Sequence, residues 1–439
     1  MAYLIGVVIA VVVLLASIAL HEVGHMVPAK RFGVRVSHYF VGFGPTLWSR
    51  TRGETEYGLK AIPLGGFVRL VGMYAPARAV GDPPTRSWVG RLAADARDAS
   101  AAEIPDGEDH RSFYRLSTPK KLVVMLGGPV MNLVIAFVLL AIVLLGFGLP
   151  TATTTLATVS QCVIPAGQDA QRTCTDADEP APGAAAGLLP GDTVVSWGGV
   201  AVSSWDELTD LIRASGGEPT QVVVDRDGTQ VGLSVTPVVA QRPTYDDSGE
   251  YVRDAHGDVV TEPVGFLGVT ATTHDVPTSL AQVPQTLAER TWQTVSVVAT
   301  LPARVVDLAR TTFSGEERGP DSIVGIVGVG RFAGEIASVQ GEGIDWGVRL
   351  AGLLEMLASL NIALFVFNLI PLPPLDGGHV AAALWEGARR QVARVRRLPR
   401  PGPSDSARLV PLAYGVFVVL GAMGLLLVYA DLVDPVRIT

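Results

Sequence analysis

Two histidines and a glutamate lie within five residues of one another near the start of the chain, in the sequence HEVGH at 21–25. On a helix, His21 and His25 lie one turn apart on the same face, where their imidazoles can bind a single zinc ion. Glu22 lies beside them and is placed to accept a proton from the water that attacks a peptide bond. These residue types at this spacing are typical of a metal-dependent hydrolase.

The motif is unusual because it directly follows an apolar run from Tyr3 to Leu20 that is suited to a membrane helix. An ionisable group at bilayer depth costs about 2.5–3.5 kcal/mol on insertion scales. Three such groups within five residues therefore indicate a function or a binding partner. The alternative is a helix end whose histidines lie among the lipid headgroups.

A second polar cluster lies far along the chain, in NLIPLPPLDGGH at 368–379. Its prolines predict a broken helix at membrane depth, where freed backbone groups need protein or a water-filled cavity as partners. A catalytic zinc site usually has three protein ligands and one open position. Asp376 is the predicted third ligand, because it lies at the same end of a neighbouring span as His21.

Two asparagines precede this carboxylate on the predicted helix. Asn361 and Asn368 are seven residues apart and share a helical face, so both are candidates to donate hydrogen bonds to an oxyanion or to the substrate backbone. For Asn361, a hydrogen bond between two spans is an equal alternative. His379 is a further candidate for a supporting contact.

Composition predicts a protein with several membrane spans. Hydrophobic residues make up 48% of the 439 residues, which is high for a soluble protein. Four segments are apolar over about 20 residues, the length that crosses a bilayer. We expect spans within residues 1–27, 120–149, 350–380 and 409–432.

Charge is distributed unevenly along the chain. Lys and Arg outnumber Asp and Glu by 15 to 9 between residues 30 and 121, and by 7 to 2 between 386 and 408. Between residues 150 and 300 the balance is 6 to 19. Basic loops stay in the cytoplasm. We therefore expect a multi-pass protein of the cell membrane, with both termini and the acidic middle outside and the metal site near the cytoplasmic side. The same bias explains the arginine cluster, so nucleic-acid binding is not indicated.

Residues 28–72 predict a β-rich region that is too polar to span the membrane. It can fold back toward the bilayer beside the metal motif, and an exposed strand edge there could hold a substrate as an added strand. A small cytoplasmic β-domain without a catalytic part is the alternative. Residues 73–119 form a predicted cytoplasmic insertion, of which 73–109 is rich in Pro, Ala, Arg and Asp and is expected to be mobile.

The acidic middle predicts a compact α+β domain over residues 155–239. AAGLLPG at 185–191 precedes a strand, Ser204 and Glu207 form a capping box for a helix, and a hairpin turns at Asp227–Gly228. This order resembles a bacterial PDZ domain, whose role here is peptide binding, size filtering or plugging. Cys162 and Cys174 predict a disulfide outside the cytoplasm; a zinc pair is disfavoured because no histidine lies near them.

Residues 264–345 combine two patterns. From Thr278 to Thr312 apolar and polar residues are mixed at helical spacing, which predicts a long amphipathic helix. GPDSIVGIVGVG at 319–330 is too short to span the bilayer. We expect it to be re-entrant or to lie on the surface.

Five motifs together carry a resemblance to a known family: HEVGH at 21–25, FVGFGP at 40–45, PLGGFVRL at 63–70, GGPVMN at 127–132 and NLIPLPPLDGG at 368–378. They resemble the site-2 protease family of intramembrane zinc metalloproteases. The PDZ-like middle is similar to the bacterial branch, and the composition to actinobacterial members. The implied fold is an α-helical polytopic membrane protein with four transmembrane helices, a membrane-associated β-rich loop and an extracytoplasmic α+β PDZ-like domain.

The resemblance implies regulated intramembrane proteolysis. An upstream site-1-type protease first shortens a single-pass membrane protein, which is then cut within its span; typical substrates are anti-sigma factors and remnant signal peptides. By position, His21, His25 and Asp376 would bind Zn²⁺, Glu22 would be the base, and Asn368 would assist at the scissile carbonyl. The unwound substrate would lie along Gly65, Gly66, Phe67 and Val68.

Two other classes of protein stay open. A divalent-metal transporter could use the same cluster of histidines and aspartate, but transporters usually show internal repeats with broken helices, which this sequence lacks. A non-catalytic scaffold could bind peptides through its PDZ-like domain. The intact Glu22 favours an enzyme over that scaffold.

Overall fold

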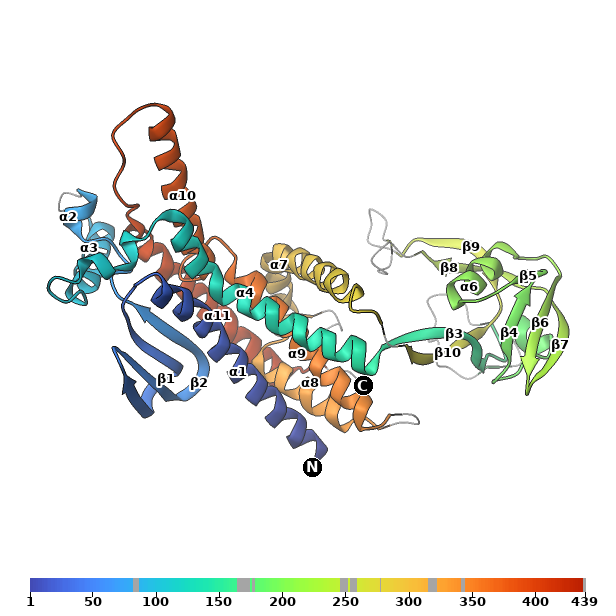
Figure 1. The fold of residues 1–439 in the computed structure, drawn as a ribbon. Coiled ribbons are helices and arrows are strands. Elements are labelled where there is room, and N and C mark those ends of the chain that lie inside the picture. Colours follow the sequence, from blue (N-terminus) through green and yellow to red (C-terminus); the bar gives the residue numbers. More distant parts are fainter. Residues whose placement is uncertain are drawn as a thin grey trace. The chain divides into compact units, whose positions relative to one another are not determined.

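The computed structural model describes residues 1–81, 87–163, 174–175, 178–244, 252, 259–276, 278–314, 322–340 and 344–436 (Figure 1). The chain forms two compact units. We call residues Met1–Phe147 with Thr278–Thr439 the membrane unit, and residues Gly148–Pro277 the middle unit.

Four helices of the membrane unit are long and apolar enough to cross a bilayer, among the residues that the structure describes. This confirms the existence of the four predicted helices. They are α1 (Ala2–Arg31), α4 (Thr118–Ile142, continued by a π-helical turn Val143–Phe147), α9 (Trp346–Asn368) and α11 (Val410–Val433, preceded by a 3₁₀ turn Ser406–Leu409).

The third predicted span, residues 350–380, is too long at its C-terminal end, whereas the predicted break of the helix at the prolines is confirmed. Helix α9 stops at Asn368, and residues 369–375 form turns. The prolines in that segment lack the N–H that a helix needs and clash with the preceding turn. A separate helix, α10 (Asp376–Val395), begins at Asp376, so the prediction of a basic loop over 381–408 is also wrong. Its run of Ala, Arg, Leu and Gln has high helix propensity.

The segment after the middle unit folds into two helices. Helix α7 (Gln282–Ser314) confirms the predicted amphipathic helix. Helix α8 (Ile326–Ser338) packs against α1, where a Cβ added at Gly6 would lie only 2.3 Å from the carbonyl oxygen of Ala333. The buried carboxylate of Asp431 accepts hydrogen bonds from the N–H groups of Gly325 and Gly328, both at 2.9 Å. The surface-lying alternative is therefore wrong for the described part; residues 319–321 lie outside the described residues.

A long hairpin in the membrane unit confirms the predicted β-rich region. Strands β1 (Val36–Arg52) and β2 (Thr55–Leu70) pair antiparallel with several register shifts. Residues 38–41 have partners in 66–69 and also in 56–59, so 66–69 is an edge that pairs with no second strand among the described residues. Tyr39 anchors the hairpin by donating a 2.9 Å hydrogen bond to the carbonyl oxygen of Ala19 in α1.

The predicted mobile insertion contains ordered helices. Helix α2 (Ala77–Val80) is followed by α3 (Trp88–Ala102), and 3₁₀ turns span Asp109–Arg111 and Phe113–Arg115. Ser87 caps α3, and the buried Arg97 binds both carboxylate oxygens of Asp405 at 3.1 and 2.6 Å. The expectation of mobility is wrong here, because alanines at helical spacing and this bidentate ion pair fix α3 to the segment before α11. Residues 82–86 lie outside the described residues.

The middle unit is built on a sheet with strand order β10-β3-β4-β6-β7. Its core contains the fully buried Trp197, Leu208, Val222 and Val224. The strands are β3 (Leu149–Val159), β4 (Thr193–Trp197), β5 (Val200–Ala201), β6 (Thr220–Arg226), β7 (Thr229–Val235), β8 (Val238–Pro243), β9 (Thr261–Phe266) and β10 (Val269–Val276), and the helices are α5 (Pro182–Ala185) and α6 (Trp205–Ala214).

Local sequence signals of the middle unit are confirmed, but its predicted boundaries are not. Ser204 caps α6 by accepting a hydrogen bond from the N–H of Glu207, and the β6–β7 turn has positive φ at Asp227 and Gly228. The predicted domain ends at 239, whereas β10 pairs with β3 and β9 pairs with β8. The predicted region 264–345 therefore begins inside the middle unit. These pairings join residues far apart in sequence, which no local pattern reveals.

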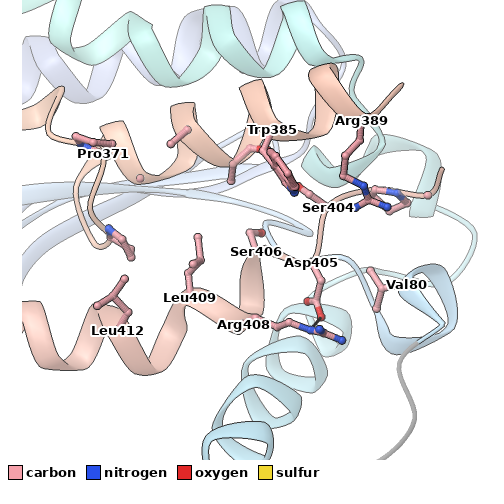
Figure 2. A pocket seen from close by; sticks show the side chains of 16 residues that line it. Val80, Pro371, Trp385, Arg389, Ser404, Asp405, Ser406, Arg408, Leu409 and Leu412 are labelled. Carbon is pink, nitrogen blue, oxygen red and sulfur yellow. Dashed lines mark hydrogen bonds and ion pairs between the residues drawn. The ribbon is translucent and has the colours of Figure 1, made fainter. Parts of the chain in front are cut away.

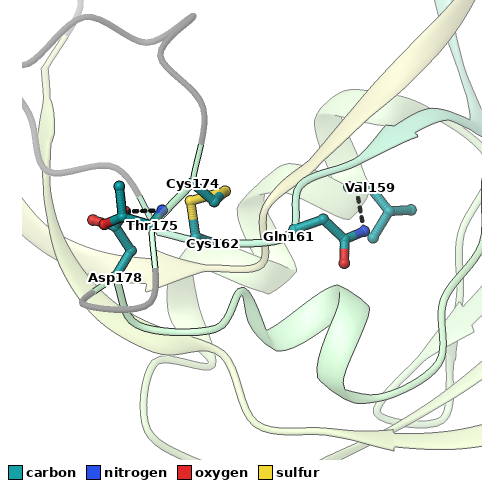
Figure 3. Close-up of a disulfide and its surroundings, with 6 residues drawn as sticks. All are labelled: Val159, Gln161, Cys162, Cys174, Thr175 and Asp178. Atoms are coloured by element: carbon teal, nitrogen blue, oxygen red, sulfur yellow. Dashed lines mark hydrogen bonds between the residues drawn. A yellow bond between two sulfur atoms is a disulfide. The ribbon is translucent and has the colours of Figure 1, made fainter.

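The predicted disulfide is present between Cys162 and Cys174, whose Cα atoms are 5.9 Å apart (Figure 3). On the same loop, the N–H and hydroxyl of Thr175 both donate to a carboxylate oxygen of Asp178. Most of the bridged loop, residues 164–173, lies outside the described residues.

An ion pair between the buried Asp192 and the partly exposed Arg226 supports the middle unit, and its removal has a predictable cost. Asp192 is 1% exposed and accepts two 2.7 Å hydrogen bonds from Arg226. These hydrogen bonds hold the pKa of Asp192 below its ordinary value. We expect Asp192→Asn to lower the free energy of unfolding by about 2 kcal/mol at neutral pH. Hydrogen bonds to charged groups contribute about 1.5–3 kcal/mol to stability.

The pH dependence of this effect has a definite sign. A carboxylate whose pKa is lower in the folded state than in the unfolded state stabilises the fold at pH values above its unfolded-state pKa of about 3.9. That stabilisation is lost as the pH falls through the folded-state pKa. The difference between wild type and Asp192→Asn should therefore shrink in acid. Urea unfolding of a 148–277 fragment between pH 7 and pH 3 would measure it. Asp210→Asn, on the exposed side of α6, is the control and should change little.

Candidate metal centre

Three side chains from two helices converge at one point of the membrane unit. The Nε2 atoms of His21 and His25 lie 3.2 Å apart, and each is 3.3 Å from Oδ2 of Asp376. Zinc bound tetrahedrally at about 2.0–2.1 Å separates its ligand atoms by about 3.3 Å. The three measured distances therefore fit one zinc ion. Among the described residues, this is the group of His, Cys, Asp and Glu side chains that can hold a metal.

The hydrogen-bonding state of these atoms supports the same fit. The buried Oδ2 of Asp376 has no hydrogen-bond partner. His25 Nδ1 lies 2.7 Å from the carbonyl oxygen of Val124, which can only accept, so Nδ1 carries the proton and Nε2 presents a lone pair. Lone pairs of nitrogen and oxygen that face one another at this distance repel unless a cation lies between them.

Close contact between α1 and α4 shapes the site. A Cβ added at Gly127 would lie 1.9 Å from the carbonyl oxygen of Gly24, so only glycine allows this approach. A Cβ at Gly128 would lie 2.2 Å from His25 Nε2 and 2.7 Å from His21 Nε2. That atom would occupy the space of the metal. Gly24 of HEVGH and the two glycines of GGPVMN thus meet at the centre.

Helix α10 carries Asp376, the third member of this candidate metal group. Asp376 is its first residue, where the positive end of the helix dipole favours a carboxylate. Ten residues further on, the buried Glu386 accepts a 2.8 Å hydrogen bond from the buried Lys121 of α4 and a 2.9 Å hydrogen bond from the N–H of Ser404. These contacts fix α10 against α4, which also carries Gly128.

Asn132 is a site residue that the sequence reasoning missed. Its Nδ2 is placed 3.2 Å from His21 Nδ1, while its Oδ1 is buried without a partner. The two ends of an amide side chain are assigned from such networks. With His21 Nε2 on the metal, Nδ1 carries a proton, and the reversed amide would accept it through Oδ1. The signal in the sequence that could have found Asn132 is its position in GGPVMN, one of the motifs that carry the family resemblance.

We expect Asn132→Ala to weaken zinc binding about 10- to 100-fold, the usual effect of removing a hydrogen bond that orients a metal-bound histidine. Zinc affinity would be measured by competition with a chromophoric chelator. Asn361→Ala is the matched control, because Asn361 is buried and donates to the carbonyl oxygen of Leu357 at 2.9 Å. Equal affinity loss in both variants would contradict a specific role for Asn132.

Glu22 lies between the ligands and the edge of the hairpin. A Cβ added at Gly66 would be 3.2 Å from Cγ of Glu22. Phe67 stacks on Phe40 with ring centres 5.6 Å apart. The structure thus brings the sequence-predicted base and the predicted substrate strand, residues 65–68, to one place.

Three other predicted residues are not joined to the ligands. Asn361 and Asn368 both lie on α9, and Asn368 is its last residue. His379 lines a small cavity with Tyr74, Pro373 and Pro374. Within the described residues, none of the three forms a hydrogen bond with His21, His25 or Asp376.

Comparisons with known proteins agree with this centre. A family model described as Peptidase family M50 matches residues 9–398, which include His21, Glu22, His25 and Asp376. The chain is 35% identical to "Zinc metalloprotease Rip1" of Mycobacterium tuberculosis (strain ATCC 25618 / H37Rv), over 100% of both chains. It is 33% identical to the Rip1 of Mycolicibacterium smegmatis, over 99% of this chain and 98% of the relative. "Metalloprotease MmpA" of Caulobacter vibrioides is 27% identical over 89% of both chains.

Proposed function

Because the chain belongs to peptidase family M50 and is a zinc metalloprotease, we propose that it cuts single-pass membrane proteins within their spans. The observation that carries this proposal is the place of the metal centre. His21 and His25 lie on a helix that is long and apolar enough to cross a bilayer, and Asp376 meets them from the adjoining segment. A peptide bond that reaches these residues is therefore a bond at membrane depth.

Glu22 is the proposed base. Bound zinc supplies a Lewis acid that polarises the scissile carbonyl and lowers the pKa of water toward about 7. Glu22 accepts the proton of the attacking water and then returns it to the leaving amine. No covalent link between enzyme and substrate is needed. Asn132 and the carbonyl of Val124 hold the two imidazoles in the orientation that leaves Nε2 available.

The edge at residues 66–69 is the proposed substrate site. A helical peptide bond is shielded by its own hydrogen bonds, so the substrate must unwind before it is cut. Pairing with the free side of this edge would offset the helical hydrogen bonds that are lost. The distance of 3.2 Å from a Cβ added at Gly66 to Cγ of Glu22 supports this assignment, because the edge and the proposed base are then neighbours. Asn368 and Asn361 stay candidates for contacts with the substrate from α9.

The proposed topology follows the charges. Lys30 and Arg31 end α1, and Lys120 and Lys121 begin α4, which assigns these ends and the hairpin to the cytoplasm. Both termini and the middle unit are then extracytoplasmic, where the disulfide is stable. We propose that the middle unit is a PDZ-like domain that binds or filters a substrate end, and the order of its strands and helices supports this proposal.

The proposed substrates are anti-sigma factors or remnant signal peptides, already shortened outside by a site-1-type protease. The transporter and the scaffold are disfavoured, because the family and the relatives are metalloproteases. The test uses full-length protein in proteoliposomes with single-span substrates, either intact or trimmed on the outer side. Mass spectrometry of the products should place the cut within the apolar span of trimmed substrates. Cuts confined to water-exposed loops would overturn the proposal.

A further inference from the structure

A cavity of about 610 Å³ lies between α10, the proline-rich turn before it and the start of α11. This volume is within the range of about 300–1,000 Å³ that small-molecule sites occupy. None of its lining residues ligates the metal, although Gly378 lies two residues from Asp376. We call this hollow the basic cavity.

The basic cavity has one charged end and one apolar end. Figure 2 shows Arg389 and Arg408 toward one end, and Pro371 and Leu412 toward the other. Asp405 is the carboxylate in the lining, and it is already bound by Arg97 of α3 and by Arg408 at 2.9 Å. Arg389 forms no ion pair with a described residue. Three arginines around one carboxylate leave the charged end positive.

The orientation of this charge matches the boundary of the membrane. Arg408 precedes the apolar helix α11, which begins at Val410, so it lies where that span leaves the hydrocarbon. Arg389 lies three residues after Glu386, which is paired with Lys121 near the start of the span α4. Both arginines are therefore at headgroup level. Leu412 and Pro371 lie deeper, toward the hydrocarbon.

We propose that the basic cavity binds an anionic glycerophospholipid, with its phosphate between Arg389 and Arg408 and the upper part of an acyl chain against Pro371 and Leu412. The apolar end excludes a free phosphate as the natural occupant, because nothing in phosphate would fill it. The exposed Trp385 at the rim has the amphipathic ring that is typical of the headgroup region. Basic pockets between membrane helices are suited to anionic headgroups.

The test compares four full-length proteins purified in a non-ionic detergent: wild type, Arg389→Gln, Ala381→Trp and Arg396→Gln. Ala381 lines the cavity, so tryptophan there would fill it without changing charge. Arg396 is the C-terminal cap of α10 and does not line the cavity, so its variant matches the charge loss of Arg389→Gln. Each protein would be titrated with phosphatidylglycerol, phosphatidylcholine or inorganic phosphate. Native mass spectrometry would count bound lipid, and thermal unfolding would report stabilisation.

We expect wild type and Arg396→Gln to bind one phosphatidylglycerol at least tenfold more tightly than phosphatidylcholine. Arg389→Gln and Ala381→Trp should each lose at least tenfold in phosphatidylglycerol affinity, with zinc content unchanged as the control for folding. An equal loss of phosphatidylglycerol affinity in Arg396→Gln would overturn the proposed site, because the lipid would then respond to the overall positive charge of this region. Equal stabilisation by inorganic phosphate would overturn the lipid as occupant.

Discussion

Replacing Glu22 with glutamine should leave about one zinc per chain and lower the rate of peptide-bond cleavage by about 10²–10⁴-fold, the usual contribution of a general base. Glutamine has nearly the same shape as glutamate but cannot accept the proton of the attacking water. The three ligands, His21, His25 and Asp376, are unchanged, so the metal should stay. Elemental analysis and cleavage of a trimmed single-span substrate would be measured on the same preparation.

The zinc content and the cleavage rate together decide between the possible roles of Glu22. Zinc in both proteins with cleavage only in wild type identifies the base. Loss of zinc from Glu22→Gln would show instead that Glu22 helps to hold the metal. Cleavage at the wild-type rate in the variant would contradict the assignment of the base outright. Because Glu22 also lies beside Gly66 of the proposed substrate edge, substrate affinity should be measured separately with the inactive variant.

Replacing Gly128 with alanine should abolish zinc binding, with an affinity loss of at least about 100-fold, and should abolish cleavage with it. The added Cβ would lie 2.2 Å from His25 Nε2, which is about the zinc–nitrogen distance of 2.0–2.1 Å. The methyl group and the ion cannot share that space. Moving α4 away would instead break the contact between Gly127 and Gly24, where the backbones already touch.

Gly421→Ala is the matched control for this substitution. Gly421 lies in the apolar helix α11, and a Cβ added there meets nothing within 4 Å. Alanine also has higher helix propensity than glycine, so this variant should be as stable as wild type and fully loaded with zinc. Stoichiometric zinc in Gly128→Ala would show that α1 and α4 move apart more easily than their packing indicates. The close approach of these two helices would then not be required for metal binding.

The geometry also changes the design of one experiment on the substrate strand. By the sequence alone, Gly66→Pro tests strand pairing, since proline lacks the backbone N–H. In the structure, any Cβ at Gly66 would lie 3.2 Å from Cγ of Glu22 and 3.0 Å from the carbonyl oxygen of Phe40. Such a variant would disturb the base together with the edge. Loss of cleavage in it would therefore not isolate the strand.

The sequence by itself determined the chemistry of the site. HEVGH provides two histidines at a spacing that the helix repeat converts into a shared face, and a lone carboxylate among prolines marks the candidate third ligand. It also determined the four apolar helices, the cap at Ser204 and the turn at Asp227–Gly228. These features depend on residues within about four positions of one another, or on mean hydropathy, which are local properties.

Only the tertiary structure decided what surrounds that chemistry. Asn132 meets His21 across 111 residues, and Lys121 meets Glu386 across 265. The start of α10 at Asp376 and the pairing of β10 with β3 also depend on the tertiary structure. Each depends on how closely two helices or strands approach, and that approach is set by glycines and buried ion pairs on both partners at once. No periodicity along one segment contains this information, because the partner is chosen by packing in three dimensions.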